Sequence, residues 1–186
     1  MSSQAVSLNL IVKNPDEEFR LIEEALDGSC DAFKTLFTRN VTRVYSLCLR
    51  ISADQYIAEE ITQEVFIKAW EKLRSFQFDS KFSSWLHRIA VNQFLMHIRS
   101  EKRNSEREEE YGKVRLNHDL NRGTDNKIDL ENAISKLPAQ ARAVLVLYDI
   151  EGYKHKEISE FMNIEIGTSK AHLHRARKIL REELSK

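Results

Sequence analysis

The chain has 186 residues, of which 41% are hydrophobic and 31% charged, with only five Gly and two Pro. This length allows one medium domain or two small ones, and the composition favours a helix-rich protein over a β-sandwich, a β-barrel or a disordered chain. The formal net charge is zero, but residues 16–31 and 54–64 are acidic, whereas residues 81–103 and the C-terminal end are basic. Separated zones of opposite charge predict two kinds of partner, a polyanion and a basic protein surface.

The lack of a recognisable targeting signal and the cysteine spacing predict a cytoplasmic protein. The N-terminus lacks a basic segment, the apolar stretch at residues 8–12 is too short for a signal peptide, and no apolar run reaches the length of a membrane span. Cys30 and Cys48 show neither CxxC nor secreted-domain spacing, which predicts reduced thiols in the core. We therefore expect no membrane insertion.

The N-terminal half predicts a series of helices. Residues 1–15 have no clear period and are expected to form a loose lead-in. A short acidic helix over residues 16–26 ends before Gly28, and a longer one begins near Asp31 and breaks at residues 52–54. The next helix has apolar residues at helical spacing from 58 to 73 and an acidic opposite side.

A polar and aromatic loop, SFQFDSKF, follows at residues 75–82. Ser83 or Ser84 is then expected to cap a helix that ends at the basic patch around Arg103. Residues 104–128 are polar, charged and poor in aliphatic side chains, so their composition predicts a linker.

The C-terminal part predicts a compact group of four helices. Helical signals return at Asp129, and Pro138 suits the first turn of another helix. Gly152 closes that helix, a short amphipathic helix follows, and Thr168 is expected to cap the last helix. We predict an all-α fold of two small helical domains joined by a flexible linker, the C-terminal one containing a helix-turn-helix. The expected boundaries are a lead-in at 1–15, an N-terminal domain at 16–103, the linker at 104–128 and a C-terminal domain at 129–186.

The last helix has one apolar face and one basic stripe. Its apolar positions are Leu173, Ala176, Leu180 and Leu184, whereas its stripe, at i, i+4, i+7 and i+11, consists of Lys170, His174, Arg177 and Arg181. A basic helix presented by a helix-turn-helix is suited to enter a DNA major groove.

A second cluster combines aromatic and basic side chains. Its members lie in and beside the loop at residues 75–82 and comprise Arg74, Phe76, Phe78, Lys81, Phe82, Trp85 and Arg88. Arg88, Asn92 and Arg99 share a face of the following helix. This combination predicts a surface for single-stranded nucleic acid, because the rings can stack on bases, the charges attract phosphate and the amide can bond a base edge. Phe82 and Trp85 fit an equally good alternative, packing in the domain core.

Five motifs in order give the chain its resemblance to a known family: AFKTLF, AEEITQEVFIKAWEKL, SFQFDSKFSSWLHRIAVNQF, ISKLPAQARAVLVLYDIEGYKHKEIS and IGTSKAHLHRARKIL. From about residue 21 to residue 184 the sequence resembles an extracytoplasmic-function (ECF) sigma factor of bacterial RNA polymerase. The resemblance implies that the chain binds core RNA polymerase, directs it to specific promoters and opens the DNA strands.

The resemblance divides these tasks among three sets of residues. An acidic helix, expected to have no local Lys or Arg partners, would dock on a coiled coil of the polymerase clamp through Asp54, Glu59, Glu60, Gln63 and Glu64. A pocket for a flipped base of the minus-ten element, which would nucleate strand opening without ATP, is implied for Phe76, Gln77, Phe78, Asp79, Ser80, Lys81, Trp85, Arg88, Asn92 and Arg99.

The third set would read the minus-thirty-five element as duplex DNA. Base edges or nearby backbone would be contacted by Lys170, Ala171, His174 and Arg175, and phosphates by Arg177, Lys178 and Arg181, and Thr168 belongs to the same set. The resemblance also implies an anti-sigma factor as a partner.

The chain departs from the family pattern at the start of the last helix. Where the family commonly has GTVKSR, this chain has GTSKAH at residues 167–172. Ser169 replaces an apolar, packed residue, so we expect the recognition helix to pack differently or less tightly. Ala171 and His172 remove donors, which predicts an altered minus-thirty-five preference.

Other classes of function explain less of the sequence. His172 and His174 point to different sides of a helix with neither Cys near them, so we expect no metal. No catalytic constellation stands out, His87 and His97 are interpreted as helix-surface residues, and we expect neither an enzyme nor a cofactor. A stand-alone helix-turn-helix regulator leaves the aromatic loop and the acidic helix unexplained. A decoy that binds polymerase without reading promoters does not explain the retained Phe76, Asn92 and basic stripe.

Overall fold

The structure is a computed structural model that describes residues 15–110 and 126–185. All regular structure in these ranges is helical, in two groups, α1–α4 and α5–α8, which confirms the predicted all-α fold. Most of the predicted lead-in and the middle of the predicted linker lie outside the described residues, so the predicted domain boundaries stay predictions. By its internal contacts the chain divides into two compact units, one up to Arg39 and one from Asn40 onward.

The first unit consists of α1 (Pro15–Leu26) and the beginning of α2 (Cys30–Ser52). Helix α1 buries Leu21, Ile22 and Ala25, which recur at helical spacing. Gly28 has a φ of +98°, a left-handed conformation that favours glycine and ends α1 as predicted. The Arg39 guanidinium donates to the Glu17 carboxylate within this unit, and this bond lowers the pKa of Glu17.

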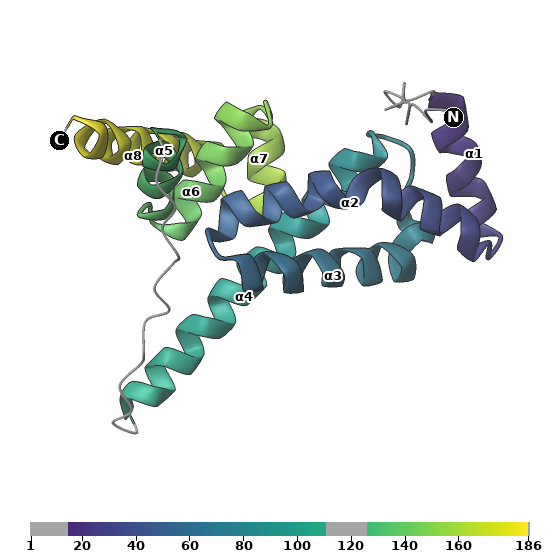
Figure 1. Ribbon diagram of the computed structural model, residues 1–186, viewed down its shortest axis with the longest axis horizontal. Coiled ribbons are helices and arrows are strands. Elements are labelled where there is room, and N and C mark those ends of the chain that lie inside the picture. The colour runs from purple at the N-terminus through teal and green to yellow at the C-terminus, as the bar shows by residue number, and fades with distance from the viewer. Residues whose placement is uncertain (1–14, 111–125, 186) are drawn as a thin grey trace, which may run out of the picture. The chain divides into compact units, whose positions relative to one another are not determined.

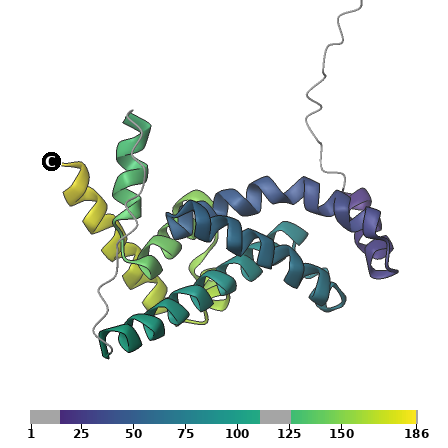
Figure 2. The same cartoon turned by 60° about the horizontal axis from the view of Figure 1, so that its bottom comes forward.

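The second unit begins with the rest of α2, followed by α3 (Gln55–Lys72), a short 3-10 turn η1 (Leu73–Ser75) and α4 (Phe82–Glu110). Helices α3 and α4 pack side by side (Figures 1 and 2). Their shared core consists of small and aliphatic side chains, which lets the helices approach closely; it includes Ala58, Val65, Ala69, Leu86, Ala90 and Val91, each fully buried.

Helix α4 differs from its prediction at both ends. It starts at Phe82, so Ser83 is a buried residue of the first turn, and it continues past the predicted end at Arg103 to Glu110. The extension has no apolar stripe, which is why composition predicted a linker there. Glu and Arg are nevertheless strong helix formers, and Lys102 and Glu106 form an i, i+4 ion pair in this segment.

The C-terminal helices are α5 (Asn126–Ser135), α6 (Ala139–Leu145), the π-turn η2 (Val146–Ile150), α7 (His155–Met162) and α8 (Ile166–Leu184). Helix α6 is buried over its last five residues and packs on α8, which also contacts α5 and α7. Asn163 has a left-handed φ of 52° and caps α7, so α7, this turn and α8 form the predicted helix-turn-helix. Helix α8 starts at Ile166, which places Thr168 inside the helix and corrects its predicted role as the cap.

The described residues contain neither a membrane-spanning helix nor a cluster of metal-binding side chains. None of their helices has both the length and the apolar character needed to cross a bilayer. Within the same residues, no group of three or more His, Cys, Asp or Glu side chains is placed to hold a metal ion.

Candidate nucleic-acid interface

A cluster of aromatic rings supports the loop between η1 and α4. The Phe76 ring centroid lies 5.6 Å from that of Phe82 and 5.4 Å from that of Trp85. Phe76 and Phe82 are buried and Trp85 is half-buried. Three of the four aromatic side chains therefore form the base of the loop. Phe76, which the sequence placed on the surface with Phe78, belongs to the core because the loop folds its ring beneath Phe78.

Phe78 projects from this base into solvent. Its side chain is 42% exposed, and its ring centroid lies 4.8 Å from that of Phe76. The Phe78 backbone has a left-handed φ of 59°, which is uncommon for a bulky residue and is a strained conformation. Exposure of a large ring and backbone strain at the same residue are features of a binding site. The neighbouring loop residues are exposed as well: Gln77, Asp79, Ser80 and Lys81.

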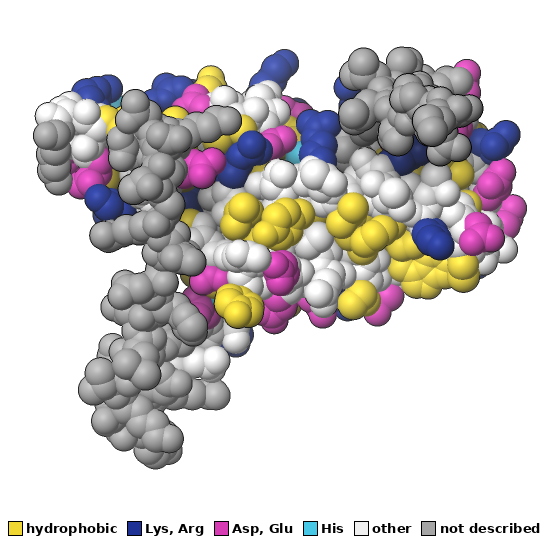
Figure 3. Space-filling view, viewed as in Figure 1, with side chains coloured by type: hydrophobic (Ala, Val, Ile, Leu, Met, Phe, Trp, Pro, Cys, Tyr) yellow, Lys and Arg dark blue, Asp and Glu magenta, His cyan; other side chains and the backbone are white. Residues whose placement is uncertain are grey.

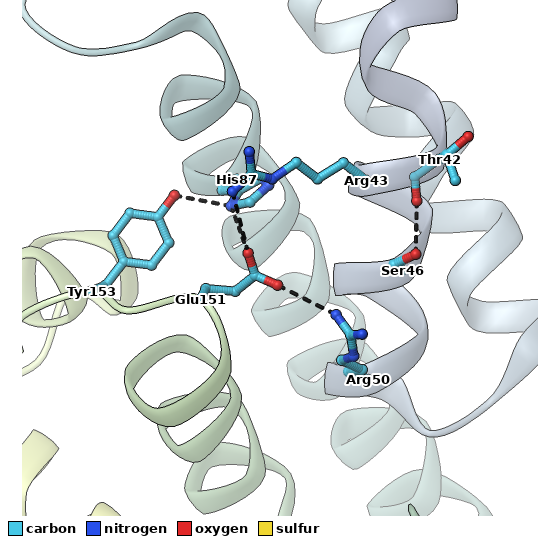
Figure 4. Close-up of polar contacts among 7 residues, drawn as sticks. All are labelled: Thr42, Arg43, Ser46, Arg50, His87, Glu151 and Tyr153. Atoms are coloured by element: carbon cyan, nitrogen blue, oxygen red, sulfur yellow. Dashed lines mark hydrogen bonds and ion pairs between the residues drawn. The ribbon is translucent and has the colours of Figure 1, made fainter. Parts of the chain in front are cut away.

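Helix α4 continues this surface with polar groups. Arg88, Asn92 and Arg99 are all exposed at i, i+4 and i+11, so the predicted shared face is solvent-accessible. His87, predicted on the helix surface, is instead only 1% exposed. Its ring is covered because the Tyr153 hydroxyl lies 2.9 Å from its Nδ1 (Figure 4). Because Tyr153 is far from His87 in the sequence, no local sequence pattern predicts that His87 is buried.

Helix α3 presents the predicted acidic row. Glu59, Glu60, Gln63 and Glu64 are exposed, whereas Asp54 caps the helix by accepting a hydrogen bond from the Ile57 amide at 3.0 Å. Hydrophobic side chains gather beside acidic ones over α3 and the adjoining part of α2 (Figure 3). Helix α3 has three large exposed hydrophobic side chains, those of Tyr56, Ile67 and Trp70.

The expectation that the acidic row has no basic neighbours is wrong. Glu60 and Glu64 line one groove with Arg99 and Arg103 of α4, because α4 packs along α3. Lys68 pairs with Glu71 on α3 itself, and this hydrogen bond is the main cause of the raised pKa of Lys68. The row is therefore an exposed acidic surface with basic groups at its border.

Helix α8 has one buried face and one exposed basic face. Ser169, Leu173 and Ala176 are buried. At 3.6 residues per turn, Ala171 and Lys178 lie opposite this face. The exposed predicted contacts are Thr168, Lys170, Ala171, His174, Arg175, Arg177, Lys178 and Arg181.

Arg177 differs from the other cations because it is already paired. Its guanidinium donates to both Asp149 oxygens, at 3.2 and 2.5 Å, and lies 5.7 Å from the centre of the Tyr148 ring. The hydrogen bond with Asp149 raises the pKa of Arg177. Arg177 thus joins α8 to η2, whereas Lys178 faces away from the buried side.

Ser169 is bonded inside the helix-turn-helix. It is fully buried, and its hydroxyl lies 2.9 Å from Nδ1 of His155, the first residue of α7. The His155 ring stacks on Tyr148 with centroids 4.5 Å apart. Ser169 therefore makes a polar contact inside the helix-turn-helix, and the expectation that α8 packs differently or less tightly than in relatives stays a prediction.

The sequence interpretation did not single out Arg142, Glu151 or Tyr153, whose side chains contact residues far away in the sequence. It also placed both thiols in the core, but Cys30 is exposed and only Cys48 is buried. Burial raises the pKa of Cys48 to about 11.

The fold and these surfaces define a helical DNA-binding protein with a helix-turn-helix and a separate aromatic surface. The family model for Sigma-70 region 2 matches residues 36–104, and that for Sigma-70 region 4 matches residues 127–180. We call these the region 2 and region 4 segments.

Curated relatives agree with this match. ECF RNA polymerase sigma factor SigW of Bacillus subtilis is 34% identical over 176 residues, which cover 88% of this chain and 94% of that protein. SigE of Mycolicibacterium smegmatis is 35% identical over 161 residues, 81% of this chain and 61% of that longer protein. The chain belongs to the ECF family of RNA polymerase sigma factors.

Solved structures show the same fold. Sigma factor RpoE of Bartonella quintana, crystallised with the anti-sigma factor NepR, is 27% identical with a TM-score of 0.65, covering 82% of this chain and 96% of RpoE. CnrH, solved with the cytosolic domain of CnrY, has 23% identity and a TM-score of 0.60, covering 91% of this chain and 98% of CnrH.

Proposed function

We propose that this chain binds core RNA polymerase, directs it to specific promoters and starts strand opening by capturing a base of the minus-ten element. The observation that carries the capture step is Phe78, an exposed ring on a strained backbone above an aromatic base. A stacked base contributes about 1–3 kcal/mol, which is comparable to the few kcal/mol needed to take one base out of the duplex. The chain performs no chemical step.

The minus-ten surface combines two kinds of contact. Phe78 offers a stacking face, and Asn92 offers an amide that donates to and accepts from a base edge. Arg88 and Arg99 share the exposed face of α4 with Asn92 and provide charge for the phosphates of the melted strand. Phe76, Phe82 and Trp85 hold the loop in place from below.

Helix α8 reads the minus-thirty-five element. Lys170, Ala171, His174 and Arg175 face the base edges or adjacent backbone, while Lys178 and Arg181 contact phosphates, which position the helix without specifying sequence. Arg177 supports this helix through Asp149 and adds a phosphate contact at its edge. Ala171 lies at the centre of the exposed face and contributes no donor, which gives a preference different from that of a GTVKSR relative.

The acidic row on α3 docks on the polymerase. Glu59, Glu60, Gln63 and Glu64 form an exposed surface suited to a basic protein partner. Asp54 contributes by starting the helix that carries them. The exposed Tyr56 and Ile67 add apolar contact area to the same helix.

An anti-sigma factor is the proposed inhibitor, and the cytoplasm the proposed location. RpoE of Bartonella quintana, a similar sigma factor, was crystallised with the anti-sigma factor NepR. Purification of this chain from its native host under non-inducing conditions should recover a stoichiometric protein partner. Recovery of the chain alone would contradict this part of the proposal.

Run-off transcription tests the proposal. Purified core polymerase is given a genomic promoter library with and without this chain, and new transcripts from defined sites are expected only with it. Asn92→Ala should suppress them, whereas Ser75→Ala, an exposed change beside the loop, should not. Binding of the chain to duplex DNA but not to polymerase would support the stand-alone regulator. Polymerase binding without new start sites would support the decoy.

A further inference from the structure

The turn η2 carries two adjacent side chains that contact the recognition helix α8. It is a π-turn, in which the Glu151 amide donates to the Val146 carbonyl, five residues back, at 3.0 Å. Such turns are rare, and many of them lie at functional sites. Tyr148 and Asp149 of this turn both contact Arg177 of α8, so η2 does more than connect α6 to α7.

The Tyr148 ring is the point where two routes to α8 meet. On the first route, the Arg177 guanidinium lies 5.7 Å from the centre of the Tyr148 ring while it donates to both Asp149 oxygens. On the second, the His155 ring stacks on Tyr148 with centroids 4.5 Å apart and an interplanar angle of 26°, and its Nδ1 lies 2.9 Å from the Ser169 hydroxyl. Tyr148 and His155 are half-buried and Ser169 is fully buried, so the second route runs inside the helix-turn-helix.

The two routes reach α8 at different places. Ser169 and Arg177 lie at i and i+8, which on an α-helix is ~12 Å along the axis and ~80° around it. Two contacts placed in this way limit both sliding along the axis and rotation about it, whereas one contact would let the helix pivot. Apolar packing restrains these movements less, because the buried face of α8 has the small side chains of Ser169 and Ala176 beside Leu173, which form only shallow ridges.

We propose that Tyr148 is a positioning residue for promoter reading, whose ring holds α8 at a fixed rotation through His155 and Arg177. This rotation determines which exposed side chains of α8 face the base edges. Hydrogen bonds to base edges depend on direction, so a small rotation reduces sequence discrimination, whereas contacts to phosphates carry no sequence information. The effect on discrimination rests on the proposed function of α8 as the reader of the minus-thirty-five element, but the restraint of α8 by Tyr148 does not.

Nuclear magnetic resonance of the full chain tests the restraint without DNA. Protons held over the face of an aromatic ring give signals shifted upfield. In the unchanged chain and in Tyr148→Phe, which keeps the ring, the His155 ring protons should therefore lie upfield of their position in Tyr148→Leu. Identical His155 signals in the Phe and Leu variants would overturn the restraint.

Promoter binding by holoenzyme tests the effect on sequence reading. Core polymerase with each variant is titrated onto a promoter found by run-off transcription and onto the same promoter with a scrambled minus-thirty-five element. A partly unfolded variant lowers both apparent affinities by the same factor, so the ratio of the two affinities separates positioning from stability. Tyr148→Leu should lower this ratio about tenfold, the combined effect of losing a stacked pair and a cation–π contact. Tyr148→Phe should keep it.

Two further variants complete the test. Ile150→Ala changes an exposed neighbour in the same turn and should keep the ratio. Asp149→Asn weakens the other hold on Arg177 at an exposed site and should lower the ratio about threefold. Equal ratios for Tyr148→Leu and Tyr148→Phe would overturn the proposal, as would an unchanged ratio for Asp149→Asn if Tyr148→Leu does not fold. The expected His155 shifts in a chain that directs no transcription would reject the proposed function while the restraint of α8 stands.

Discussion

The two proposed DNA surfaces of this sigma factor are built in opposite ways. The proposed base-capture loop, residues 76–81, has its exposed aromatic contact in Phe78, a single ring on a left-handed backbone. The recognition helix α8 distributes its contact over several exposed side chains on a regular helix whose other face is buried. Strain and exposed apolar area therefore occur at the loop proposed to hold a base outside the duplex, whereas the helix proposed to read intact duplex has ordinary helical geometry.

The difference predicts how mutations act. In the loop, removal of a buried ring should destabilise the fold, whereas removal of the exposed ring should impair the capture of a base. A change in α8 removes one of several similar contacts and has a smaller effect on binding. The predictions below test this contrast, from the largest expected effect to the smallest.

Phe76→Ala should destabilise the protein most. Its ring is 7% exposed and contacts both Phe82 and Trp85, and removal of a buried Phe side chain costs about 3–5 kcal/mol. Urea unfolding followed by circular dichroism measures the loss, and Phe76→Leu should recover much of it. If Phe76→Ala keeps full stability, the ring is not the support of the loop.

Phe78→Ala should impair transcription without unfolding the chain. Loss of a stacking contact of about 1–3 kcal/mol lowers promoter opening by about 5- to 150-fold. A side chain this exposed contributes little to stability. Run-off transcription and thermal melting should therefore separate Phe78 from Phe76. Phe78→Tyr, which keeps a stacking face, is the control. A large drop in melting temperature for Phe78→Ala would show that its role is structural.

Ser169→Ala should loosen the helix-turn-helix. The change leaves His155 Nδ1 without its 2.9 Å partner, a loss of about 1 kcal/mol, which lowers the melting temperature of a unit of this size by about 2–4 °C. Ser159→Ala is the matched control because that hydroxyl bonds only a carbonyl of its own helix, that of Lys156. Equal melting temperatures for the two variants would show that the hydrogen bond between Ser169 and His155 does not stabilise the helix-turn-helix.

Lys178→Ala and Arg177→Ala should differ in their salt dependence. Lys178 lies opposite the buried face, so its loss should reduce the slope of log affinity against log salt by about 1. Arg177 is held by Asp149, and its loss should change that slope less. Titration of holoenzyme onto promoter DNA at several salt concentrations measures both. Equal reductions would show that the Asp149 pair does not restrain Arg177.

The sequence predicted the helices better than their ends. Apolar spacing located α2, α3, α4 and α8, because burial of one face decides whether such helices form. The ends of the helices depend on local polar interactions, which leave no apolar pattern in the sequence. Lys102 and Glu106 extend α4 beyond its last apolar turn, and the start of α8 at Ile166 includes Thr168, which had looked like its cap.

Helical spacing was sufficient to predict that Asn92 and the cations of α8 are exposed. The burial of Phe76 and His87 could be recognised only in the tertiary fold. In a polar stretch of sequence, nothing distinguishes a ring that packs inside the protein from one that contacts a ligand. Arg142 was missed for the same reason, because the carbonyl oxygens that it bonds are 90 and 91 residues away.

Permanganate probing of a promoter found by run-off transcription tests the central claim most directly, because it detects unstacked thymines in the minus-ten element. We expect reactive thymines with core polymerase and the unchanged chain. With Phe78→Ala we expect them to be lost while DNase I protection over the minus-thirty-five element persists. Equal thymine reactivity for Phe78→Ala and the unchanged chain would contradict base capture by this loop.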